Sequence, residues 1–80
     1  MRVTVHWYGP LRDRRGCASE EVETGAPTLD ALWDELMRIH ALPPRRELAL
    51  AVAVDDELAT WNTAPSAGDT IAFLPPVAGG

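Results

Sequence analysis

The chain opens with alternating apolar and polar residues. In residues 2–8 the apolar positions fall on one face: Val3, Val5 and Trp7. A period of two predicts a half-buried strand, which Gly9-Pro10 would end. Residues 11–16 are rich in arginine and predict a polar turn or a short helix. A second strand is predicted from Glu20 to Thr24, with Val22 inward and acidic neighbours that suit an exposed sheet edge.

A helical repeat follows Gly25-Ala26-Pro27. Apolar side chains recur at helical spacing at Leu29, Leu32, Trp33, Leu36 and Met37, with His40 on the same stripe. This spacing predicts an amphipathic helix of about 14 residues. Thr28 is suited to the N-cap and Asp30 to the positive end of the helix dipole. Pro43-Pro44 should end the helix.

The remaining chain predicts a hairpin and a final strand. Residues 48–54 are apolar, Asp55-Asp56 is suited to a tip, and residues 57–60 would form the returning strand. A loop through Pro65 then leads to Gly68-Asp69, which turns the chain into an apolar strand from Thr70 to Leu74.

The order strand, strand, helix, strand, strand, strand predicts a two-layer α+β domain. We expect a mixed sheet of four to five strands packed on one main helix. The first and last strands are the most apolar and should lie at the sheet centre, parallel to each other if the helix crosses over between two hairpins. This is the arrangement of the ubiquitin-like β-grasp fold. The expected boundaries are a folded domain at 1–74 and a flexible tail at 75–80.

Composition narrows the classes of function. The 80 residues are enough for one small domain, and a net charge of −5 argues against binding to nucleic acid. All seven basic residues are arginine. The chain shows no signal peptide and no apolar run of membrane-spanning length, so we expect a cytoplasmic protein without membrane contact.

The candidate ligands and nucleophiles in the body of the chain are few. Cys17 is the single cysteine, which excludes an intramolecular disulfide and suits a reducing compartment. This thiol has no neighbouring base and no second cysteine, which favours an inert side chain. His6 and His40 have no partners at metal-ligand spacing, so we expect no metal site.

The most informative segment is the tail, Pro75-Pro76-Val77-Ala78-Gly79-Gly80. The two prolines favour an extended path. The two glycines remove every Cβ, which lets the backbone enter a narrow channel. Such a segment is suited to presenting the α-carboxylate of Gly80 to the active site of another protein, and a side chain at Gly79 should block the channel. The alternative is a disordered end without function.

Residues 68–80 carry a resemblance to a known family. Gly68-Asp69-Thr70-Ile71-Ala72-Phe73-Leu74-Pro75-Pro76-Val77-Ala78-Gly79-Gly80 resembles the ending of the ubiquitin-like sulfur-carrier proteins. Within that family it is most similar to the small subunits of molybdopterin synthase. A first strand followed by Gly9, Leu11 and Arg12 also fits, as does the length.

The resemblance implies a carrier cycle. An adenylyltransferase similar to ubiquitin-activating enzymes would consume ATP and adenylate Gly80, and a sulfur-donor enzyme would convert the product to a thiocarboxylate. The tail would then enter the large synthase subunit, in an expected heterotetramer, and deliver sulfur to a cyclic pyranopterin during molybdenum cofactor biosynthesis. The carrier would bind no cofactor, and the catalytic side chains would belong to the large subunit.

The sequence also suggests docking residues and leaves other functions open. If Trp7, Ile71 and Phe73 fill the core, then Tyr8 and Leu74 lie on the open sheet face near the tail. The resemblance adds Leu58. Arg12, Arg14 and Arg15 either pair with a partner or are solvated, and we name Arg12 as the candidate contact.

The alternative functions are a sulfur carrier for thiazole, cysteine or tRNA thiolation, a ubiquitin-like protein modifier, and an interaction module with an inert tail.

Overall fold

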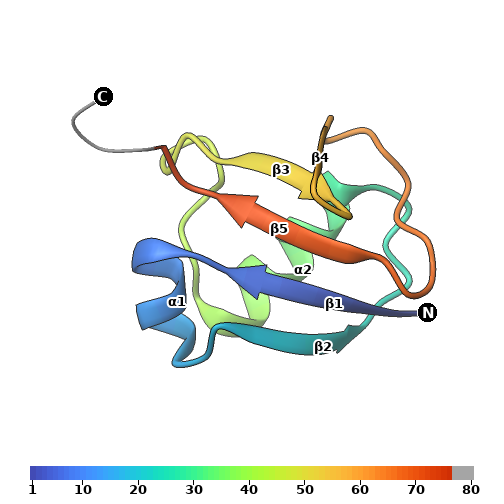
Figure 1. Cartoon of the computed structure of the whole chain (residues 1–80). Helices are drawn as coiled ribbons and strands as arrows, with labels where there is room; N and C mark the ends of the chain where they lie inside the picture. Colours follow the sequence, from blue (N-terminus) through green and yellow to red (C-terminus); the bar gives the residue numbers. More distant parts are fainter. Residues whose placement is uncertain (77–80) are drawn as a thin grey trace.

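The computed structural model describes residues 1–76, so the predicted tail residues Val77, Ala78, Gly79 and Gly80 lie outside the described residues. Within this range the chain forms, in order, β1 (Arg2–Trp7), α1 (Gly9–Arg15), β2 (Ser19–Glu23), α2 (Leu29–His40), β3 (Ala51–Val54), β4 (Glu57–Ala59) and β5 (Thr70–Leu74). Figure 1 shows α2 lying across one face of the sheet.

The five strands form one mixed sheet in the order β2-β1-β5-β3-β4. β1 and β5 run parallel at its centre, and the other neighbouring pairs are antiparallel. The acidic strand β2 lies at an edge, as its sequence predicts. This arrangement confirms the β-grasp topology. Because β1 and β5 are parallel, their C-terminal ends lie at the same end of the sheet (Figure 1).

Helix α2 begins where the sequence predicts and ends slightly earlier. The Thr28 side chain accepts a hydrogen bond of 3.1 Å from the Ala31 N–H, which caps the first turn. Ala41 adopts a left-handed conformation, with φ of 53°, and its N–H returns to the Met37 carbonyl. The helix therefore ends at His40 after 12 residues, before the prolines are reached.

Residues 9–15 form a short helix, α1, and settle the choice between a turn and a helix. Pro10 lies in its first turn, where a missing N–H costs nothing. Gly16 ends the helix with a left-handed φ of 72°. Leu11 is buried and fixes α1 to the core. This single buried residue gives no helical period, so the sequence alone could not distinguish the two forms.

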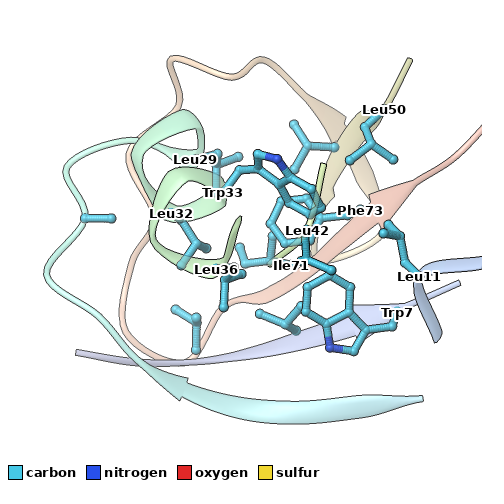
Figure 2. Close-up of a cluster of buried hydrophobic side chains, with 14 residues drawn as sticks. Trp7, Leu11, Leu29, Leu32, Trp33, Leu36, Leu42, Leu50, Ile71 and Phe73 are labelled. Atoms are coloured by element: carbon cyan, nitrogen blue, oxygen red, sulfur yellow. The ribbon is translucent and has the colours of Figure 1, made fainter. Parts of the chain in front are cut away.

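The core lies between α2 and the sheet and is centred on three aromatic side chains (Figure 2). The rings of Trp33 and Phe73 meet edge to face with centroids 4.9 Å apart, and Trp7 and Phe73 lie 5.6 Å apart. Trp61, from the loop after β4, stacks on Phe73 at 6.0 Å, while the Arg45 guanidinium lies 4.4 Å from the Trp61 ring centroid. Tertiary packing thus ties the long loops to the sheet.

Residues 1–76 offer neither a membrane-spanning helix nor a cluster of metal ligands. None of their helices has the length and apolar character needed to cross a bilayer. In the same range, no group of three or more His, Cys, Asp or Glu side chains is placed to hold a metal ion.

Candidate functional site

The predicted tail leaves the domain at the end of the central strand. Leu74, the last residue of β5, is half-buried, Pro75 is half-buried and Pro76 is exposed. The parallel register pairs Trp7 of β1 with Phe73 of β5. Tyr8 keeps an extended backbone after β1, so continuing the register by one residue places it opposite Leu74. Tyr8 and Leu74 therefore lie together at the base of the tail.

The sheet face turned away from α2, which we call the open face, carries small apolar side chains. Opposed residues of neighbouring strands share a face. The register therefore places His6, Ala72, Ala53 and Leu58 in one row across β1, β5, β3 and β4. In the next row, Leu74 is paired with Ala51. The open face thus has a floor of three alanines, with larger side chains at its margin.

The predicted docking residues occupy two places on this surface. Tyr8 and Leu74 lie at the tail end, and Leu58 lies on the edge strand β4. Leu58 is 77% exposed and Tyr8 is 44% exposed. β4 is two strands from β5, which corresponds to about 10 Å across the sheet. One partner surface could contact all three side chains, and their docking role stays a prediction.

The sequence prediction missed the two outward-facing alanines of β3, Ala51 and Ala53. The sequence pattern that could have revealed these alanines is the alternation in Ala51-Val52-Ala53-Val54, where the two valines pair with the inward residues Phe73 and Ile71. Reading residues 48–54 as one apolar run left the outward face of β3 unassigned. Alanines at these positions keep the open face shallow, so a partner can approach the strand backbones closely.

Beside α1, Glu20 gathers three side chains around its carboxylate. The Trp7 indole Nε1–H donates to Oε2 at 2.6 Å. Arg15 donates through Nε and Nη2, each at 2.9 Å, to the two carboxylate oxygens. Cys17 Sγ lies 3.5 Å from Oε2. We call these four residues the Glu20 cluster; it joins α1 and β2 to the end of β1.

Charge and burial act against each other at Glu20. Burial is the largest single influence and opposes ionisation, but hydrogen bonds from Arg15 and Trp7, with the Arg15 charge, outweigh it and hold the pKa of Glu20 below its usual value. The hydrogen bond with Glu20 likewise raises the pKa of Arg15. The cluster is therefore an ion pair at neutral pH.

The structure corrects the expectation that Cys17 has no neighbouring base. The Glu20 carboxylate is adjacent, but it does not activate the thiol. Burial, the hydrogen bond to Glu20 and the negative charge of that carboxylate raise the pKa of Cys17. A thiol held protonated is a poor nucleophile. The neighbour that sequence spacing did not reveal thus supports an unreactive Cys17.

The arginines of α1 divide into two groups. Arg15 is committed to Glu20. Arg12 and Arg14 are exposed, and neither forms an ion pair with another part of residues 1–76. Figure 1 shows that α1, the helix that carries these two arginines, lies at the end of the sheet where β1 and β5 end. The predicted partner contact of Arg12 stays a prediction.

The structure describes only the first two residues of the predicted tail. Pro75 and Pro76 are described and continue directly from β5. Val77, Ala78, Gly79 and Gly80 lie outside the described residues, so their predicted roles stay predictions. The boundary between a domain at 1–74 and a tail at 75–80 is also untested, although β5 ends at Leu74.

Comparison with known proteins identifies relatives of the whole chain. The model of the ThiS family matches residues 5–80. The structure of SAMP1 from Haloferax volcanii superposes with a TM-score of 0.82 at 24% identity, covering 100% of both chains. A putative molybdopterin converting factor subunit 1 from Pyrococcus furiosus gives 0.79 at 22% identity, covering 96% of this chain and 99% of that one.

A third structure is a complex. In the protein–protein complex of subunits 1 and 2 of molybdopterin-converting factor from Helicobacter pylori, the matching chain has a TM-score of 0.66 and 29% identity, with 100% of both chains covered. A search of curated proteins found no match. The family match spans nearly the whole chain, and the shared fold agrees with it. The chain belongs to the ThiS family of ubiquitin-like sulfur-carrier proteins.

Proposed function

We propose that this chain is the sulfur-carrier small subunit of molybdopterin synthase. The observation that carries the proposal is its similarity, over the full length of both chains, to a protein in a complex of subunits 1 and 2 of molybdopterin-converting factor. The ending Pro75-Pro76-Val77-Ala78-Gly79-Gly80 supports it, because it resembles the ending of those small subunits.

The proposed chemistry takes place at the Gly80 carboxylate. A carboxylate is a poor electrophile, so an adenylyltransferase first joins it to AMP from ATP and releases pyrophosphate. Hydrosulfide supplied by a sulfur donor then attacks the acyl carbon, AMP leaves, and a thiocarboxylate remains. The ionised sulfur is a strong nucleophile towards a pyranopterin held by the large subunit. The carrier needs no catalytic side chain and no cofactor in this cycle.

The described surface is suited to the carrier role. The open face offers a shallow apolar floor at the end of the sheet from which the tail leaves. Arg12 adds a positive charge beside it, which would favour an acidic patch on the partner. Docking through Tyr8, Leu58, Leu74 and Arg12 would place the tail at a fixed entrance, and this positioning can supply much of the rate.

The test reconstitutes sulfur transfer. The chain carrying a thiocarboxylate is mixed with the large subunit encoded in the same genome and a cyclic pyranopterin, and formation of the dithiolene is measured. We expect turnover with the thiocarboxylate and none with the ordinary carboxylate or with a chain lacking Gly79 and Gly80. The proposed pathway is wrong if the thiocarboxylate yields no dithiolene while another carrier from the same cell does.

The same material separates the alternatives. A carrier for thiazole, cysteine or tRNA thiolation would give up its sulfur to those acceptors instead. A protein modifier would appear in cell extracts as a ladder of heavier conjugates joined through Gly80. An interaction module with an inert tail would keep its cellular function after deletion of Gly79 and Gly80.

A further inference from the structure

The start of α1 and the start of the tail lie at the same place on the sheet. β1 and β5 are parallel neighbours, with Trp7 opposite Phe73. Two residues further along each chain segment are Gly9, the first residue of α1, and Pro75. Figure 1 shows both segments leaving the same end of the sheet. The direction of the tail is therefore decided next to Gly9.

The Pro75 ring lies close to the backbone of Gly9. Gly9 has a left-handed φ of 54°, and a Cβ added there would lie 3.6 Å from Pro75 Cγ. That separation is ordinary van der Waals contact, so a methyl group would fill the remaining space and any larger side chain would meet the ring. Pro75 is half-buried, whereas Pro76 is exposed. The proline that lies beside Gly9 is therefore Pro75, the first of the two.

Helix α1, which begins at Gly9, is held firmly against the rest of the domain. Leu11, two residues later, is 2% exposed in the core. At the far end of α1, Arg15 binds Glu20, which also accepts the Trp7 indole hydrogen bond. α1 cannot shift away from the tail without disturbing these contacts. Pro75 therefore lies beside a firmly held segment of chain, and Leu74, the residue before it, is in register with Ala51 of β3.

We propose that Gly9 and Pro75 are positioning residues for the reaction at Gly80, because the close approach of the Pro75 ring to the Gly9 backbone sets the direction in which the tail leaves the domain. The inference rests on the proposed function. Each proline fixes its own φ, so an orientation set at Pro75 is carried into Pro76. Glycines at the end of the tail provide no side chain that could correct a wrong direction. Misplacement of a reacting group by about 1 Å can slow a reaction by about 100-fold.

The test compares two glycines that flank the same helix. Gly9→Val places a branched side chain against Pro75. Gly16→Val creates similar backbone strain, because Gly16 has a φ of 72°, but nothing lies within 4 Å of its added Cβ. A second pair, Pro75→Ala and Pro43→Ala, removes the same φ restraint from two half-buried prolines, one at the start of the tail and one in the loop after α2. This pair keeps the test informative if the valine variants fail to fold.

The readout is adenylation of the full chain by the adenylyltransferase from the same genome, followed as pyrophosphate release at varied carrier concentration. We expect Gly9→Val and Pro75→Ala to lower kcat at least about tenfold with little change in KM, because the docking surface is intact. Gly16→Val and Pro43→Ala should retain most of kcat. Thermal unfolding of each variant, scored against its control, separates loss of folded protein from misdirection of the tail.

Failure of the proposed function and failure of the positioning role give different results. If wild-type chain is not adenylated at all, the proposed function fails and the inference falls with it. If wild type is adenylated but each variant matches its control, or if the loss lies entirely in KM, the proposed function stands and the positioning role is overturned. As an independent check, nuclear Overhauser effects between the Gly9 α-protons and the Pro75 ring protons should be present in wild type and lost in Gly9→Val.

Discussion

Removing the Glu20 carboxylate should destabilise the domain more than any other single change at a partly exposed residue of β2. Glu20→Ala leaves the Trp7 indole N–H without its acceptor in a residue only 1% exposed, and it leaves Arg15 without its partner. Glu20→Gln keeps a carbonyl oxygen for Trp7 but loses the negative charge. The two variants therefore separate the hydrogen bond from the ion pair.

The magnitudes follow from the exposure of each partner. An unsatisfied buried donor costs about 1–3 kcal/mol, and a hydrogen bond to a charged group contributes about 1.5–3 kcal/mol. The Arg15 side chain is 19% exposed and can turn towards water, so its loss is at the lower end. We expect Glu20→Ala to lower the free energy of unfolding by about 3 kcal/mol and Glu20→Gln by about 1 kcal/mol.

Urea unfolding at several pH values measures both effects. Because the pKa of Glu20 is lower in the folded chain than its ordinary value of 4.5, its stabilising effect is complete above that value and declines as the pH falls below it. The stability difference between wild type and Glu20→Gln should therefore shrink in acid. Equal effects of the two variants at pH 7, or a difference that persists unchanged well below pH 4.5, would refute the reasoning.

Three further results follow from the surface and the tail. Leu58→Asp should weaken docking to the proposed large subunit by about 10–100-fold, as measured by calorimetry, because a leucine side chain that becomes buried on docking contributes about 1.5–3 kcal/mol. The matched control is Ile39→Asp on α2, which is 71% exposed on the opposite layer and should bind normally. Cys17→Ser should leave sulfur transfer within about twofold of wild type, since a protonated thiol takes no part; loss of transfer would show that Cys17 carries sulfur. Gly79→Ala should slow adenylation while the melting temperature stays unchanged, and normal kinetics would argue against a narrow channel.

The elements that sequence predicted well are those with a strong period. The alternation of apolar and polar residues predicted which side chains of β1 point into the core, and the 3.6-residue repeat located the end of α2 to within two residues. The central parallel pair followed from the apolar character of β1 and β5 together with a single crossover helix. These features depend on local pattern and on the need to bury one face, which the sequence displays directly.

The contacts that sequence missed join residues without a shared period. In the sequence, Glu20 is only an acidic residue of a predicted edge strand. In the structure, its carboxylate accepts hydrogen bonds from Trp7 at the end of β1 and from Arg15 in α1. The approach of Gly9 to Pro75 spans almost the whole chain and depends on the register of β1 and β5. Such contacts are set by tertiary packing, so composition and spacing cannot reveal them.

The most direct test of the carrier account is tandem mass spectrometry of the C-terminal peptide from protein isolated from its native cell. The account predicts that sulfur replaces one oxygen of the carboxylate at Gly80. Fragments must locate the mass change, because a sulfoxide at Met1 or Met37 adds nearly the same mass. An ordinary carboxylate at Gly80 under every sulfur-demanding growth condition, without lysine conjugates of partner proteins, would contradict the account and leave a passive interaction module.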